Sequence, residues 1–145
     1  MTVKQISVYI ENRKGRLAEA TRYIADHKIN LRALSIADSQ DFGILRLICD
    51  DPQETNQILQ EGGYLTRLNN VLAVEMEDRP GSLADILDVL AAKDIDVEYT
   101  YAFLSRVKDK AYLVIKTADN DKAIALLKGA GITPVAQEEL ARVFE

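Results

Sequence analysis

The segment Glu11-Asn12-Arg13-Lys14-Gly15-Arg16-Leu17-Ala18 is repeated 66 residues later as Glu77-Asp78-Arg79-Pro80-Gly81-Ser82-Leu83-Ala84. The correspondence continues at the same offset with Ala25 and Ala91, and then with Ile29 and Ile95. Repeats of solenoid proteins usually have periods of about 20–50 residues, so this longer period indicates a duplicated small domain. The sequence therefore predicts two domains, residues 1–68 and residues 69–145. Units this small are marginally stable alone, so we expect them to share a sheet or a core.

Each half has the same predicted order of strands and helices. In the first half, strands are expected at 3–10, 30–37, 44–48 and 64–66, with helices at 15–28 and 52–61. In the second half, strands are expected at 71–76, 97–104, 111–116 and 132–136, with helices at 81–93 and 119–128 and a short terminal helix at 137–144. A turn is expected at 39–41. The order βαββαβ is the split βαβ or ferredoxin-like motif, which predicts an α+β fold of two such units packed side by side into an extended antiparallel sheet.

The bulk composition excludes several classes of function. The net charge is −5, and the basic residues are scattered among acidic ones, so direct nucleic-acid binding is not expected. The single cysteine excludes an internal disulfide and a cysteine-based zinc site, and the sequence predicts neither a metal nor a cofactor. The N-terminus lacks the apolar region of a signal peptide, and no apolar stretch approaches the ~20 residues of a membrane span. We therefore expect a cytoplasmic protein without membrane contact.

Both repeated segments resemble the loop between the first strand and first helix of ACT domains, small regulatory modules that bind amino acids. The second copy, with its Pro80-Gly81 pair, matches the family pattern better than the first, so of the two sites we favour the one built on Asp78 to Leu83. Later segments resemble the same family, so the resemblance covers essentially the whole chain: Ile29-Asn30-Leu31 and Ile95-Asp96-Val97 at the second strand, and Gly43-Ile44-Leu45 and Ala111-Tyr112-Leu113 at the third. The chain is similar to a stand-alone tandem ACT protein. The resemblance implies a non-catalytic, regulatory amino-acid sensor.

A glycine between a strand and a helix allows backbone N–H groups to converge on an anion, and the helix N-terminus favours negative charge. An amino acid's α-carboxylate fits there, while Asn12 or Asp78 can reach its α-ammonium group. The resemblance further implies sites at the interface between the domains, where Asn12 faces Asp96-Val97 and Asp78 faces Asn30-Leu31. The predicted ligand-binding residues are Asn12, Arg13, Gly15, Arg16, Leu17, Asn30, Leu31, Asp78, Arg79, Gly81, Ser82, Leu83, Asp96 and Val97.

Some features of the loops have two interpretations. Arg13 and Arg79 can clamp a carboxylate or pair with Glu11 and Glu77. The loop glycines can serve a ligand or only a tight turn, and Asp78 and Asp96 can cap a helix and start a strand. Lys14 replaces the usual proline, which is expected to loosen the first turn. Ile10 and Met76 stand where some serine-binding members are polar, so the ligand's side chain is not determined. An apolar or flat side chain fits near Ile10 and Met76, the acidic residues favour a cationic one, and glycine or a branched-chain amino acid is not excluded.

Three further features have plain structural explanations. His27, the only histidine, is expected at an exposed helix end, and Cys49 is expected to be a buried or edge thiol. The aromatic side chains of Tyr99, Tyr101 and Phe103 alternate along one strand. They indicate sheet packing rather than a base-stacking surface, because no basic groove accompanies them.

Two other functions remain as alternatives. One is a structural or protein-interaction module that binds no small molecule. The other is a small acyl-phosphate hydrolase, which needs an anion-cradling loop with a catalytic arginine and a water-orienting amide. That loop pattern is missing, and no nucleophile–base constellation replaces it, so no catalytic residue is predicted. Sheet edges invite pairing, so a homodimer through Tyr9, Tyr64 or the Tyr99 strand is possible, as is a regulatory protein partner.

Overall fold

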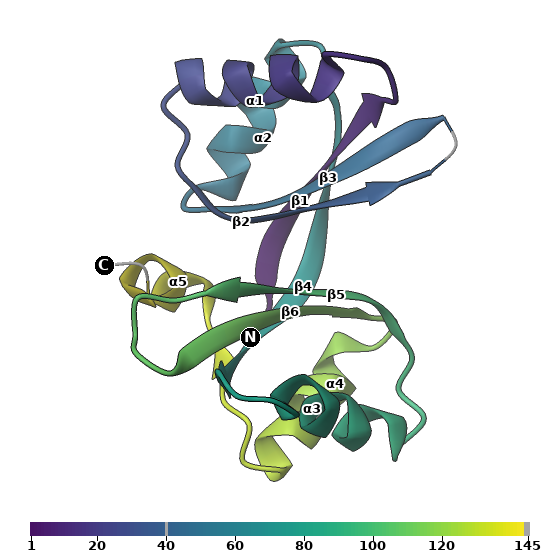
Figure 1. Ribbon diagram of the computed structural model, residues 1–145, viewed down its shortest axis with the longest axis vertical. Coiled ribbons are helices and arrows are strands. Elements are labelled where there is room, and N and C mark those ends of the chain that lie inside the picture. Colours follow the sequence, from purple (N-terminus) through teal and green to yellow (C-terminus); the bar gives the residue numbers. More distant parts are fainter. Residues whose placement is uncertain (40, 144–145) are drawn as a thin grey trace. The chain divides into compact units, whose positions relative to one another are not determined.

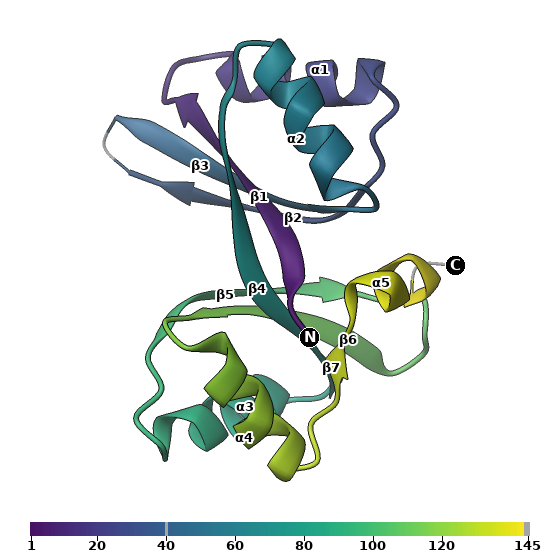
Figure 2. The ribbon, with the colours of Figure 1, turned by 180° about the vertical axis from the view of Figure 1, so that it is seen from behind.

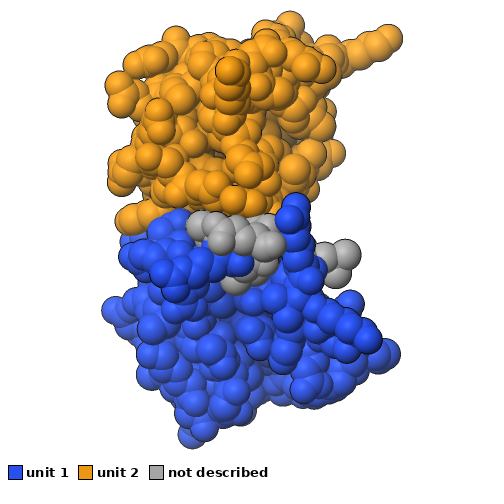
Figure 3. All heavy atoms as spheres, turned by 90° about the vertical axis from the view of Figure 1, so that its left-hand side faces the viewer, with its two compact units in different colours: residues 1–3, 70–145 blue, residues 4–69 orange. Residues whose placement is uncertain are grey.

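The structure is a computed structural model that describes residues 1–39 and 41–143. Gln40 of the expected turn, Phe144 of the expected terminal helix and Glu145 lie outside the described residues. The chain divides into two compact units, which Figure 3 shows in different colours. We call residues 4–69 the N-terminal unit (orange) and residues 1–3 with 70–145 the C-terminal unit (blue). None of the described helices is both long and apolar enough to cross a membrane.

The N-terminal unit contains an antiparallel sheet with two helices on one face (Figure 1). Its elements are β1 (Val3–Glu11), α1 (Arg16–Asp26), β2 (Leu31–Asp38), β3 (Phe42–Cys49), α2 (Pro52–Glu61) and the beginning of β4 (Leu65–Glu77). The strand order is β2-β3-β1-β4. The register places Ile6 opposite Leu47 and Val8 opposite Leu45. These side chains face the helices and form a buried core with Leu59 of α2.

The C-terminal unit repeats this arrangement, with α3 and α4 on one face of its strands (Figure 2). It contains the rest of β4, then α3 (Ser82–Ala91), β5 (Val97–Leu104), β6 (Lys110–Thr117), α4 (Asn120–Gly129), β7 (Pro134–Val135) and α5 (Gln137–Val143). The strand order is β5-β6-β4-β7. Val74 lies opposite Leu113, as Val8 lies opposite Leu45 in the other unit. The predicted α+β, ferredoxin-like fold is confirmed for both units.

The prediction of separate strands at 64–66 and 71–76 is wrong, because β4 runs without a break from Leu65 to Glu77. Asn69 and Asn70, at the expected junction, are held in the extended strand by partners on other elements. Ser7 Oγ donates to Asn69 Oδ1 at 2.7 Å, and Asn120 Nδ2 donates to the carbonyl of Asn70 at 2.9 Å. The single strand β4 therefore provides a strand to the sheet of each unit.

The other differences from the predicted bounds lie at element ends. The helices expected from residues 15 and 81 begin one residue later, because Gly15 and Gly81 are their N-caps in the left-handed conformation. The same helices end earlier than expected, at Asp26 and Ala91, and the connections that follow them contain Lys28 and Asp94 with positive φ. The strand expected at 132–136 shortens to Pro134–Val135, where the proline has no N–H for a ladder. Helix 52–61 and strand 97–104 match their predictions.

Candidate functional site

The two repeated loops have the same backbone geometry. In each, the N–H of the third loop residue donates to the carbonyl of the first, at 2.8 Å for Arg13 and 3.0 Å for Arg79. Gly15 and Gly81 have φ angles of 85° and 89°, a region that side chains other than glycine rarely adopt. The first loop keeps the same bond although Lys14 replaces proline. The glycines are thus required by the turn itself.

The two helices that follow the loops differ from the other long helices at their N-termini. Asp51 and Asp119 cap α2 and α4, each accepting a bond from a backbone N–H of the first turn. Among the described residues, no side chain caps α1 or α3 in this way. The first i to i−4 bond of α1 joins the Glu19 N–H to the Gly15 carbonyl. Of the amides just before it, that of Arg16 donates to the Arg13 carbonyl in the loop at 3.2 Å. The next amides of the first turn lie at the positive end of the helix dipole.

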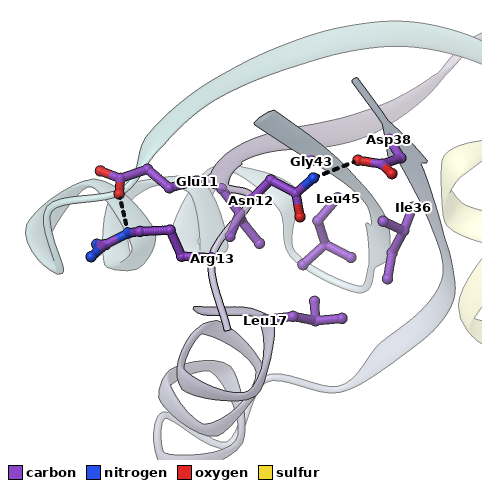
Figure 4. A pocket seen from close by; sticks show the side chains of 9 residues that line it. Glu11, Asn12, Arg13, Leu17, Ile36, Asp38, Gly43 and Leu45 are labelled. Carbon is purple, nitrogen blue, oxygen red and sulfur yellow. Dashed lines mark hydrogen bonds and ion pairs between the residues drawn. The ribbon is translucent and has the colours of Figure 1, made fainter. Parts of the chain in front are cut away.

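A hollow of about 240 Å³ lies beside the first loop (Figure 4). It is lined by Ile10, Glu11, Asn12, Arg13, Leu17, Ile36, Asp38, Gly43 and Leu45. Three predicted site residues, Asn12, Arg13 and Leu17, thus come together. Asn12 Nδ2 donates to Asp38 Oδ1 at 3.1 Å, which forms a polar bridge next to the apolar side chains of Ile36 and Leu45.

Four further lining residues, Ile36, Asp38, Gly43 and Leu45, were not predicted to belong to the site. A signal for two of them was present, because Ile36 and Asp38 are two residues apart and therefore share one face of β2. The hydrogen-bond partner of Asp38 could not be predicted from the sequence, since Asn12 is 26 residues away along the chain.

Both loop arginines form ion pairs inside their own loops. Arg13 Nε lies 2.6 Å from Glu11 Oε2, and Figure 4 shows this pair turned away from Leu45 and Ile36. Arg79 contacts Glu77 and Asp85, each at 2.9 Å. Hydrogen bonds to Asp85 and then Glu77 raise the pKa of the Arg79 guanidinium above its usual value. Of the two roles considered for Arg13 and Arg79, the structure shows the ion pairs with Glu11 and Glu77.

The hollow beside the second loop is larger and polar. It measures about 370 Å³ and is lined by Glu75, Met76, Glu77, Arg79, Ser82, Asp85, Ile86, Lys110, Gly131, Ile132 and Thr133. It brings together the predicted residues Arg79 and Ser82. Lys110 Nζ pairs with Glu75 Oε1 at 3.1 Å, and Tyr112 OH lies 3.4 Å from Glu75 Oε2. Burial, followed by the charge of Glu75, raises the pKa of Tyr112. The duplicated loops therefore border hollows of different chemistry.

The remaining predicted residues lie at several places. Asn30 lines a third hollow, about 260 Å³, on the N-terminal unit. Leu31 and Val97 start β2 and β5 and pack against the cores of their units. Asp78 and Asp96 are exposed, as are Gly15, Gly81, Leu17 and Leu83, while Arg16 pairs with Glu19 at 2.9 Å. The facing of Asn12 with Asp96-Val97, and of Asp78 with Asn30-Leu31, stays a prediction.

The residues with plain explanations behave as expected. His27 is exposed at the C-cap of α1, with Nδ1 2.8 Å from the Tyr23 carbonyl. Phe103 stacks on Tyr112 of the neighbouring strand, at 5.6 Å between ring centroids. Both positions fit packing roles rather than catalysis or base stacking.

Cys49 is 1% exposed at the end of β3, and burial raises the pKa of its thiol. We expect the native protein to react slowly with a thiol reagent such as dithionitrobenzoate at pH 7, because the reactive thiolate is both scarce and covered. The same reagent should label the thiol fully and rapidly in urea. Labelling of the folded protein at the rate of the unfolded chain would contradict this burial.

Comparison with known proteins gives a matching family model and several solved structures of similar fold. The family model described as "ACT domain pair" matches residues 1–144. Protein BT0572 from Bacteroides thetaiotaomicron is 36% identical, with a TM-score of 0.87, over 97% of this chain and 96% of that one. The regulatory subunits of aspartate kinase from Thermus thermophilus and Thermus flavus share the fold at lower identity. Their TM-scores are 0.63 and 0.61, with 16% and 15% identity, over 88% of this chain and 91% and 92% of theirs. No curated protein matches the chain.

This chain belongs to the ACT domain pair family. The resemblance found in residues 11–18 and 77–84 is therefore confirmed, and it extends over nearly the whole chain.

Proposed function

We propose that this protein is a non-catalytic regulatory protein that binds an amino acid beside the loop of the N-terminal unit. The observation that supports this most is the hollow beside the first loop. There the start of α1, which no side chain caps, and the Asn12–Asp38 hydrogen bond lie next to the apolar side chains of Ile36 and Leu45. At about 240 Å³ it is smaller than the ~300–1,000 Å³ of pockets for drug-sized ligands, which suits a single amino acid.

The two ends of this hollow match the two charges of an amino acid. The first-turn amides of α1 suit the α-carboxylate, because they are donors at the positive end of a helix dipole. The Oδ1 atom of Asn12 and the carboxylate of Asp38 are acceptors, and they suit the α-ammonium group. The ligand's side chain would then extend toward Ile10 and Leu45. The same chemistry is proposed for the loop at Asp78–Leu83, with Asp78 as the acceptor.

Regulation would follow from the difference in affinity between two arrangements of the protein. A ligand shared between the domains 1–68 and 69–145 would favour the arrangement that closes around it, and a protein partner would recognise that state. The predicted facing of each loop with the second strand of the other domain gives such a shared site. We also propose a cytoplasmic location and a homodimer.

Thermal unfolding in the presence of each of the twenty amino acids, at about 1–10 mM, tests the proposal. A ligand that binds only the native state at 100 times its Kd adds about 2.7 kcal/mol of stability, so the midpoint should rise by several degrees. In Asn12→Ala the midpoint without ligand should hardly change, because Asn12 is exposed, while the rise with ligand should shrink. Gln53→Ala, exposed on α2, is the matched control and should keep the full rise.

If no amino acid raises the midpoint, the sensor function is wrong. One observation then favours a protein-interaction module. Leu34 and Ile36 are 52% and 50% exposed on β2, which is an edge strand of the sheet. Exposed apolar side chains on an unpaired edge favour association with another chain. Concentration-dependent association that Ile36→Lys abolishes would support that alternative.

A further inference from the structure

We infer that Gly43 sets the side-chain specificity of the N-terminal hollow, and that its ligand is an amino acid with a bulky side chain that presents an apolar face. This inference rests on the proposed function, since it names the class of ligand for the same site. Its basis is a glycine in the interior of a strand that the fold itself does not require.

Gly43 is the second residue of β3 and lies opposite Ile10 on β1. Its backbone is not in the left-handed region, where the described glycines are Gly15, Gly63, Gly81 and Gly131. A Cβ atom built on Gly43 would approach only the Ile10 carbonyl oxygen, at 3.9 Å, among the described atoms. Neither the backbone nor the packing therefore demands a glycine. In a strand, glycine costs stability and provides no side chain to pack.

The missing side chain leaves space in the hollow. Alternation along β3 directs position 43 to the same face as Leu45 and Leu47, which is the face covered by the helices. A side chain at this position would therefore project into the hollow that Gly43 lines. Without a side chain there, the strand backbone at Gly43 is accessible to a ligand and forms part of the wall of the hollow.

The side chains around Gly43 decide which ligand side chains the hollow can accept. Ile10 and Leu45 are almost fully buried, while Leu17 and Ile36 are 41% and 50% exposed and keep apolar surface in contact with water. A ligand side chain that covers this surface gains about 25 cal/mol for each Å² of apolar area removed from water. A short polar side chain would leave most of it uncovered. Of the polar side chains that line the hollow, Glu11 and Arg13 pair with each other, and Asn12 and Asp38 are assigned to the ammonium group.

The C-terminal unit differs at the equivalent position. Ala111 lies opposite Met76 as Gly43 lies opposite Ile10, and Ala111 is 3% exposed. The hollow found beside the second loop does not include Ala111, and its lining contains the charged residues Arg79, Asp85 and Lys110. We therefore expect the two loops of this chain to differ in the ligand side chain they accept. The apolar selectivity belongs to the N-terminal unit.

The experiment measures Kd by calorimetry for two sets of amino acids, with wild type, Gly43→Ala and Gly43→Val. One set has bulky side chains with an apolar face (leucine, methionine, phenylalanine and histidine), and the other has glycine, alanine, serine, aspartate and lysine. Wild type should bind a member of the first set most tightly. Gly43→Val should weaken the binding of that ligand by about 10–200-fold, which is the effect of methylene-sized changes in apolar pockets. The binding of glycine or alanine should weaken less. Gly43→Ala should lie between them.

Thermal unfolding without ligand serves as the folding control. Gly43→Ala should match or exceed the wild-type midpoint, because the Cβ atom has room and glycine is a poor strand residue. Should Gly43→Val unfold early, Gly43→Ala decides. Tightest binding of any member of the second set, or unchanged affinity in a folded Gly43 variant, would overturn the inference and leave the sensor function standing. Failure of every amino acid to bind wild type would overturn both.

Discussion

Replacement of Leu47 by alanine is expected to lower the free energy of unfolding by about 2–5 kcal/mol, the largest effect of any substitution considered for this chain. Leu47 is fully buried on β3, opposite Ile6, and belongs to the core beneath α1 and α2. Truncation removes apolar contacts and leaves a cavity. The cavity cannot easily close, because β3 is paired with a strand on each of its edges. Urea unfolding followed by circular dichroism measures the loss as a lower midpoint at nearly constant slope.

The duplication provides a matched experiment in the other unit. Ile115 is fully buried on β6, opposite Leu72, and occupies the place that Leu47 has on β3. Ile115→Ala should therefore cost a similar amount. Leu65→Ala is the control, because Leu65 is 69% exposed on β4 and should change stability by less than about 0.5 kcal/mol. Equal midpoints for Leu47→Ala and Leu65→Ala would show that the core is not packed as described.

Replacement of Gly15 by alanine is expected to cost about 1–2 kcal/mol, because a residue with a Cβ atom pays this amount in the left-handed conformation. The φ angle of Gly15 is 85°, and a Cβ atom there would meet no described atom within 4 Å. The cost therefore comes from the backbone and not from a clash. Urea unfolding of the variant, in the absence of any amino acid, measures it.

Gly129→Ala separates the backbone effect from the simple addition of a methyl group. Gly129 ends α4 outside the left-handed region, and a Cβ atom there also meets nothing within 4 Å. This substitution should be neutral or should stabilise by about 0.4–1 kcal/mol, since it reduces the freedom of the unfolded chain. If both variants had the same stability, the left-handed turn at Gly15 would not be a requirement of the fold.

Elements with strong local signals were predicted closely. Helix 52–61 follows from Asp51 and Pro52 at its start and Gly62-Gly63 at its end, and all of these act within a few residues. The loops of residues 11–18 and 77–84 have the geometry that their glycines require. By contrast, Asn69 and Asn70 favour a break, and only partners on distant elements keep them in β4. Local preference was overridden there by tertiary hydrogen bonds.

The candidate site likewise has one part that the sequence predicted and another part that it did not. Asn12, Leu17 and the left-handed Gly15 belong to one continuous segment, so the sequence alone placed them at the start of a helix where a carboxylate fits. The apolar floor, the Asn12–Asp38 bridge and the open position at Gly43 depend on strand pairing and on residues up to 35 positions apart, which no local pattern encodes. The sequence by itself determined the duplication and the family, because both are visible in its repeated residues, and it determined the two loops, because these follow from short-range conformational preferences. Only the tertiary structure decided which side chains line each hollow, because packing and register bring them together.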